Sequence, residues 1–87
     1  MKKINFNFKL KDLAGKDIDV FNVKEAVANA LIGQSTRNPI RNMELAKKIY
    51  NDGEIELPSE DIEIIKNAIL INDQITDLVK SQIIEVL

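Results

Sequence analysis

The first part of the chain alternates between apolar and polar side chains. Single polar residues separate the apolar ones, which is the period of a strand with one buried face, so residues 4–10 are predicted to form a strand. Asp12 and Gly15 provide a turn, and the alternation resumes over residues 17–21. This pattern predicts an N-terminal antiparallel β-hairpin. At strand spacing, its phenylalanines are typical of a core rather than of a ligand pocket; they are Phe6, Phe8 and Phe21.

Helical spacing of apolar residues then predicts four helices, over about residues 23–32, 39–50, 60–71 and 74–86. Asn22 and Glu25 have the spacing of a capping box before the first helix. Gly33 is expected to end that helix in a left-handed conformation. Pro39 suits the first position of the second helix, after Asn38 as cap. The expected buried face of this second helix comprises Ile40, Met43, Ala46, Ile49 and Tyr50.

Residues 54–57 are too few for a helix and predict a short edge strand whose two glutamates face lysine-bearing neighbours. Ser59 is expected to cap the third helix, and Glu60 and Asp61 place negative charge at its positive end. Ile64 and Ile71 widen the apolar stripe of this helix, which indicates burial on two sides.

Together these elements predict one α+β domain spanning residues 1–87. We expect an N-terminal antiparallel β-hairpin plus a short third strand, with about four helices packed on the sheet, mainly on one face.

The chain contains neither cysteine nor histidine. This excludes disulfides, thiolate metal sites and the Ser-His-Asp and Cys-His catalytic arrangements, so we predict a protein that is not an enzyme and has no cofactor. Five carboxylates lie close in sequence but lack the fixed spacing of a calcium loop, and we expect no metal site; they are Asp52, Glu54, Glu56, Glu60 and Asp61.

The net charge of −2 conceals an asymmetry between the two ends of the sequence. Residues 1–50 hold ten Lys and Arg against five Asp and Glu, whereas residues 51–87 hold two against nine. The two halves can neutralise each other on folding, or they can present a basic or an acidic docking face. The candidate anion-binding residues, which bracket and follow the start of the second helix, are Arg37, Arg41, Lys47 and Lys48. The acidic composition and the single tyrosine make nucleic-acid binding the less favoured interpretation.

No run approaches the roughly 20 apolar residues of a membrane-spanning helix, so we expect a soluble protein without membrane partners. The apolar residues of the last two predicted helices exceed what one buried face needs. They predict a possible homodimer, or a protein partner, through Ile64, Ile71, Ile83 and Leu87. An open sheet edge is the other candidate surface.

Three stretches carry a family resemblance: Phe8-Lys9-Leu10-x-Asp12-Leu13-x-Gly15-Lys16, Glu56-Leu57-Pro58-Ser59-Glu60-Asp61-Ile62 and Leu78-Val79-x-x-Gln82-Ile83. With them the chain resembles small uncharacterised proteins of tailed bacteriophages and prophages. The resemblance implies a structural accessory or a host-directed inhibitor, in the bacterial cytoplasm or in the virion. It implies no functional residue. The leading hypothesis is a non-enzymatic interaction protein that binds a host or phage protein or a second copy of itself, and the alternative is a small nucleic-acid- or nucleotide-binding regulator.

Overall fold

The structure is a computed structural model that describes residues 1–18, 22–33 and 39–87. The predictions placed on Val20, Phe21, Arg37 and Asn38 lie outside these residues.

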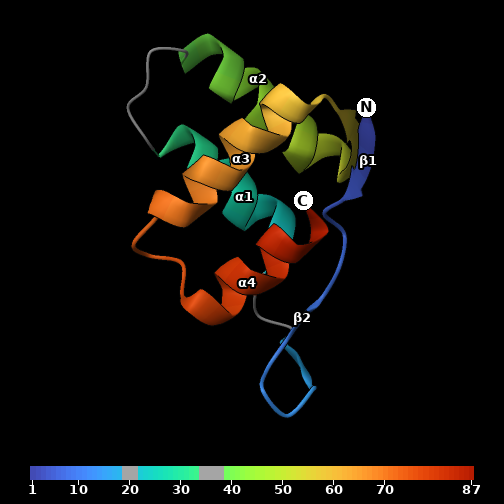
Figure 1. Cartoon of the computed structure of the whole chain (residues 1–87), viewed down its shortest axis with the longest axis vertical. Coiled ribbons are helices and arrows are strands. Elements are labelled where there is room, and N and C mark those ends of the chain that lie inside the picture. The colour runs from blue at the N-terminus through green and yellow to red at the C-terminus, as the bar shows by residue number, and fades with distance from the viewer. Residues whose placement is uncertain (19–21, 34–38) are drawn as a thin grey trace.

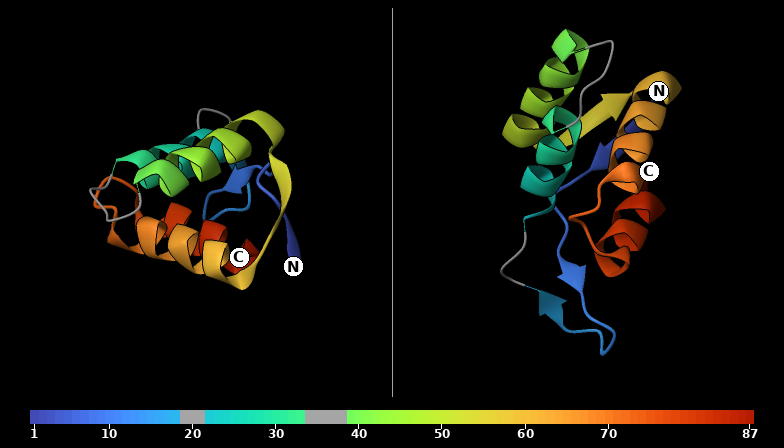
Figure 2. Two further views of the ribbon diagram at one scale, coloured as in Figure 1. Left: turned by 90° about the horizontal axis from the view of Figure 1, so that it is seen from above. Right: turned by 90° about the vertical axis from the view of Figure 1, so that its left-hand side faces the viewer.

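In the part of the chain that the structure describes, four helices form two layers, and the α+β class is confirmed (Figure 1). The helices are α1 (Val23–Ile32), α2 (Pro39–Asp52), α3 (Ser59–Ile71) and α4 (Asp77–Val86). Helices α1 and α2 form one layer, and α3 and α4 form the other (Figure 2). The two layers contact each other where α1 packs against α3. The core lies between the layers. Its fully buried members include Val27, Leu31, Ile49, Ile65, Ile69 and Ile83.

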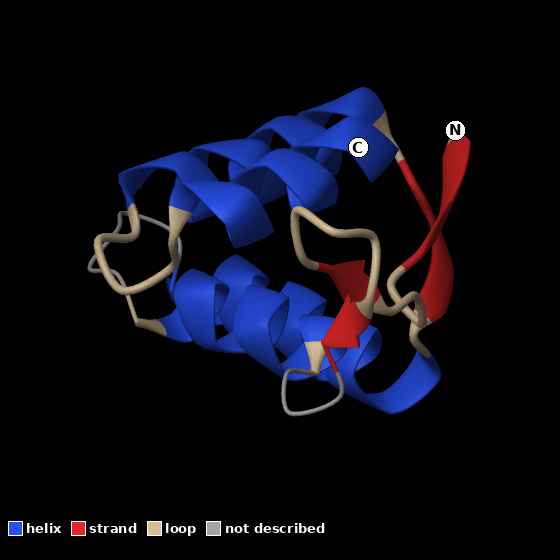
Figure 3. Ribbon diagram, turned by 90° about the horizontal axis from the view of Figure 1, so that it is seen from below, coloured by secondary structure: helices blue, strands red, loops and turns tan. Residues whose placement is uncertain are grey.

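The strands form two separate two-stranded antiparallel sheets rather than one sheet. They are β1 (Lys2–Asn5), β2 (Leu10–Lys11), β3 (Asp17–Ile18) and β4 (Glu54–Leu57). Strand β1 pairs with β4, and β2 pairs with β3. The β1–β4 sheet lies at one end of the helix layers (Figure 3). The helices therefore pack mainly on one another and not on one face of a single sheet.

The continuous strand predicted over residues 4–10 is interrupted after Asn5. The Asn5 side chain accepts the backbone N–H of Asn7 at 2.7 Å, and the N–H of Phe6 donates to the carbonyl of Gly53 at 2.7 Å. The Phe6 bond continues the register of the β1–β4 ladder by one residue, and the Asn5 side chain then turns the chain away from the ladder. The predicted alternation of burial nevertheless holds, because Phe6 is buried and Asn5 and Asn7 are exposed, while Phe8 is only partly buried.

The predicted hairpin is confirmed between Leu10 and Ile18, and it projects from the helical body (Figure 1). Its turn is closed by the Asp12 carboxylate, which accepts the N–H groups of Ala14 and Lys16. Gln82 of α4 holds the base of the hairpin through two hydrogen bonds. Its side-chain oxygen accepts the Lys11 N–H at 2.8 Å, and its amide nitrogen donates to the Lys11 carbonyl at 2.7 Å.

Helix α1 has the predicted bounds, and the Asn22 side chain accepts the N–H of Glu25 at 3.2 Å. Gly33 departs from the prediction, because its φ of −80° is right-handed and its N–H continues the helical pattern by donating to the Asn29 carbonyl. Helix α2 runs two residues beyond the predicted end, to Asp52, and stops at Gly53.

The last two helices begin at other residues than predicted. Ser59 is the first residue of α3 and not its cap, because Pro58 occupies the N-cap position. Helix α4 begins at Asp77 rather than at residue 74. The Asn72 side chain accepts the N–H groups of Gln74 and Ile75, which holds that segment in a turn.

Candidate interaction surface

Helix α2 carries large apolar side chains on its outward face. Ala46 and Ile49 are buried as predicted, but Ile40, Met43 and Tyr50 are 76%, 42% and 58% exposed. The predicted buried face of this helix was therefore wrong at these three positions.

The reason is that α2 has two sets of apolar residues, on different sides of the helix. Leu45, Ala46 and Ile49 face the core, where α2 packs against α1. The same buried face includes the polar Asn42, which is only 5% exposed. Because the buried face contains a polar residue, its apolar spacing is interrupted in the sequence. The exposed apolar residues of the helix have helical spacing too, so the pattern assigns them to the buried face.

The outward face of α2 has the spacing of a helix-pairing seam. Ile40, Met43, Lys47 and Tyr50 succeed one another at intervals of three, four and three residues, which is the a and d spacing of a heptad. We call these four residues the α2 stripe. Glu44 lies beside the stripe and lines, with Pro39 and three stripe residues other than Tyr50, a shallow hollow of about 360 Å³.

The predicted anion-binding residues are only partly brought together. Arg41 is bound to the start of α3, where its Nε donates to the Asp61 carboxylate at 3.1 Å and its terminal nitrogen makes a second, short contact with the same oxygen. The Glu60 carboxylate lies 4.0 Å from the guanidinium. The hydrogen bond to Asp61 and the charge of that carboxylate raise the pKa of Arg41. Arg37 lies outside the described residues.

Lys47 and Lys48 line a groove of about 470 Å³ between α2 and α3. Arg41 is the third cation of this groove, and three carboxylates balance the three cations: Glu44, Asp52 and Asp61. A phosphate backbone is attracted by an excess of positive charge. This groove is charge-balanced, so its geometry does not favour the nucleic-acid alternative.

The four predicted interface residues do not form one surface. Ile83 is fully buried inside the chain, so it is a core residue and the prediction that it meets a partner was wrong. Ile64 and Leu87 are partly buried against the same core. Ile71 alone is largely exposed, at 62%, and it lines a hollow of about 560 Å³ between α1 and the α3–α4 connection. Helix α3 packs on both α1 and α4, which agrees with the predicted burial on two sides for the partly buried Ile64 but not for the exposed Ile71.

Three of the five clustered carboxylates contact a basic side chain: Glu54 contacts Lys3, and Glu60 and Asp61 both contact Arg41. Glu54 pairs with Lys3 across the β1–β4 sheet at 2.9 Å, which confirms the predicted glutamate–lysine neighbours, and Asp61 pairs with Arg41. Within residues 1–18, 22–33 and 39–87, no three His, Cys, Asp or Glu side chains are grouped so that they could hold a metal ion. No helix in the described part of the chain is long and apolar enough to cross a membrane.

Among the described residues, the groups with a shifted pKa are Lys3, Asp17 and Arg41, and each lies on the surface in an ion pair. A hydrogen bond with Glu54 raises the pKa of Lys3, and a hydrogen bond from Lys11 lowers the pKa of Asp17. Catalytic groups are typically perturbed by burial in a cleft together with a specific partner, which is not the case for these residues.

The apolar spacing of α2 does not distinguish the α2 stripe from the buried face, so it predicts burial for the apolar residues of the stripe. The sequence does indicate an exposed apolar surface, because a helix that has apolar residues on two sides but only one expected packing neighbour leaves one of those sides exposed. A scan against protein-family models, a search of curated proteins and a search of solved structures each give no significant match to this chain.

Proposed function

We propose that this chain is a non-enzymatic interaction protein that binds another protein through the α2 stripe. The observation that carries the proposal is the exposure of Ile40, Met43 and Tyr50 on one face of one helix. Exposure of contiguous apolar side chains to water is unfavourable, and burial against a partner lowers the free energy. Such exposed apolar patches are typical of binding surfaces.

The composition of the stripe favours a protein partner. Tyrosine and methionine are enriched where proteins bind one another, and a helix face with heptad spacing is complementary to a second helix. Burying the three apolar side chains would supply the favourable free energy, and Lys47 and Glu44 would fix the orientation of the partner.

The open sheet edge is the weaker candidate surface. Strand β1 exposes Lys2 and Lys3, and lysines on an edge strand oppose the addition of a further strand. The Lys2 ammonium group also donates to the Leu87 carbonyl at 2.8 Å, which ties β1 to the chain end.

The resemblance to phage and prophage proteins supports the same class of function. A structural accessory and a host-directed inhibitor both act by binding a protein, and both would reside in the bacterial cytoplasm or in the virion. A phage-type origin and this location remain predictions.

Site-specific photocrosslinking in the cells that naturally make the protein tests the proposal. A photoreactive amino acid at position 50 should give a defined protein adduct, and Ile40→Asp in the same chain should abolish it. The matched control is the same amino acid at Asn67, which is exposed on α3 away from the stripe. Equal adducts from both positions, or none from position 50, would contradict the proposal.

A further inference from the structure

The α2 stripe is self-complementary, and we infer that its partner is a second copy of this chain, paired through α2 in antiparallel orientation around a two-fold axis. This inference rests on the proposed function of the stripe and specifies its partner.

The charges of the stripe decide the orientation. Glu44 and Lys47 are both exposed, and within the described ranges neither has an ion-pair contact within 4.0 Å, although the Glu44 charge acts at longer range on Arg41. In a parallel pair, each residue would face its own counterpart, which would bring Lys47 against Lys47 and Glu44 against Glu44. In an antiparallel pair centred near Leu45, Lys47 of each copy reaches Glu44 of the other. The four charges at the axis then cancel.

The apolar residues fit the same arrangement. In the antiparallel pair, Ile40 of each copy lies opposite Tyr50 of the other, and Met43 lies level with the aliphatic stem of Lys47. Lysine stems commonly cover apolar surface while the ammonium group reaches a carboxylate. Each end of the seam is therefore apolar, and its centre is charged but balanced.

The geometry of the fold leaves room for such a pair. The core-facing residues of α2 pack against α1, and the apolar residues of the stripe are exposed on another side of the helix. An isologous two-fold contact is the commonest form of homodimer. A single helix pair is shorter than a standard interface, so we expect a dissociation constant in the micromolar range, on the order of 10 µM.

The first test is sedimentation of the purified chain between about 1 and 500 µM, a range that brackets such a weak interface. We expect a monomer–dimer equilibrium that Glu44→Lys and Lys47→Glu each weaken by about tenfold or more, the size of effect typical of a close interfacial charge pair. The double variant Glu44→Lys/Lys47→Glu should restore dimerisation, because it exchanges the two signs and leaves the cluster balanced.

The matched controls are Glu63→Lys and Lys66→Glu. These residues form an ion pair at 3.9 Å with the same spacing on α3, so the controls change the net charge by the same amounts away from the stripe. They should leave the dimer unchanged. Circular dichroism of every variant should give the wild-type helix content, because all four side chains are on the surface.

The second test uses the absence of cysteine from the natural chain. A mixture of Ile40→Cys and Tyr50→Cys chains should form the mixed disulfide between the two variants on mild oxidation. Ile40→Cys alone should not cross-link, because the two copies of residue 40 would be separated by about 15 Å along the helix axis, beyond the reach of a disulfide.

Three results would overturn the dimer: a monomer at all concentrations, a double variant that is no better than the single ones, or efficient linkage of residue 40 to itself. The proposed function would survive these results if the photoreactive residue at position 50 still gave an adduct whose mass identifies a different protein. If that adduct is also missing, both proposals fail.

Discussion

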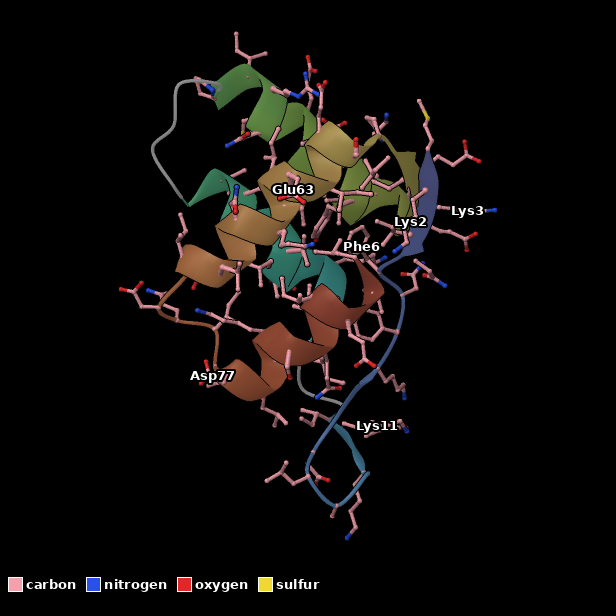
Figure 4. All side chains as sticks on the ribbon, in the orientation of Figure 1. Lys2, Lys3, Phe6, Lys11, Glu63 and Asp77 are labelled. Atoms are coloured by element: carbon pink, nitrogen blue, oxygen red, sulfur yellow. The ribbon has the colours of Figure 1, made fainter. Side chains whose placement is uncertain are left out.

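At the scale of single residues, Phe6 and Phe8 have the same place in the sequence pattern but different environments. Phe6 is 1% exposed and lies in the core (Figure 4). Phe8 is only partly buried. Alternation assigns both side chains to the same face of an extended chain. It does not say how deeply the neighbouring helices cover that face at each position.

Phe6→Ala should therefore destabilise the domain by about 3–5 kcal/mol, the range for removal of a buried aromatic side chain. Phe8→Ala should cost clearly less. Urea denaturation followed by circular dichroism measures both, and equal losses for the two variants would mean that the cover over Phe8 is as complete as that over Phe6.

Gln82 is a single residue that links two elements, because its amide pairs with both the N–H and the carbonyl of Lys11. Gln82→Glu removes the donor while keeping the size of the side chain, so we expect a loss of about 1–2 kcal/mol from the unfolding free energy. Glu85→Gln, the reverse exchange at an exposed position of α4, should be nearly neutral in the same denaturation experiment. Similar effects at the two positions would contradict the role of the Gln82 amide.

At the scale of elements, the hairpin turn and the starts of α1 and α2 follow local signals, whereas α3 and α4 begin at other residues than their local signals predict. The Asn22 cap and the Asp12 turn have the expected hydrogen bonds. Strand pairing follows a local signal in the β2–β3 hairpin but not in the other sheet, because β1 pairs with β4, some fifty residues away. Gly53 combines a local and a long-range role. It lies between the end of α2 and the start of β4, and it contacts the side chain of Asn7.

Gly53 and Gly15 both have positive φ, of 74° and 83°, but only Gly53 is crowded. A Cβ at Gly53 would overlap the Asn7 side chain, whereas a Cβ at Gly15 would meet open space. Gly15→Ala should cost about 1 kcal/mol for the left-handed backbone alone. Gly53→Ala should cost more, and thermal denaturation of the two variants should show it. If the two melting temperatures fall equally, the contact with Asn7 has no energetic consequence.

The hairpin contains an ion pair that makes it sensitive to acid. The Lys11 ammonium group donates to Asp17 at 2.9 Å and lowers the pKa of that carboxyl. A group whose pKa is lowered on folding contributes stability above its unfolded-state pKa, and this contribution is lost as the pH falls through the folded-state value. We therefore expect the ion pair to stabilise the hairpin at neutral pH and to lose this effect as the pH falls through the pKa of Asp17 in the folded chain.

Carboxyl carbon chemical shifts measured by NMR across an acid titration test this expectation. Asp17 should titrate below an ordinary aspartate, and Lys11→Met should return its pKa to the ordinary value. A normal pKa for Asp17 in the unmodified chain would show that the ion pair is not maintained in solution.

At the scale of the whole molecule, folding brings the basic and acidic parts of the sequence together. Lys3 meets Glu54, and Arg41 meets Asp61, so two of the contacts join the first fifty residues to the rest. The predicted mutual neutralisation of the two halves is confirmed at these pairs. Among the described residues, exposed apolar side chains also remain, and three of them lie on α2: Ile40, Met43 and Tyr50.

The packing of the two helix layers also gives Ile83 and Ile71 different degrees of burial. Ile83 is fully buried between the layers, so Ile83→Ala should cost about 2–5 kcal/mol. Ile71 is 62% exposed, and Ile71→Ala should change the stability by less than about 0.5 kcal/mol. Urea denaturation of the two variants compares them directly. A large loss for Ile71→Ala would indicate that its surface is covered in solution.

The sequence by itself determined the α+β class, the number of helices, most of their ends, the turn of the hairpin and the alternating burial of the N-terminal segment. These features depend on interactions between residues close in the chain, such as caps, turns and the period of apolar side chains. Only the tertiary structure decided the partners of β1, the buried face of α2 and the exclusion of Ile83 from the surface. Each depends on contacts between distant residues: Asn42 is accepted into the core face of α2, and Ile40, Met43 and Tyr50 are left outside, because α1 packs against one side of that helix only.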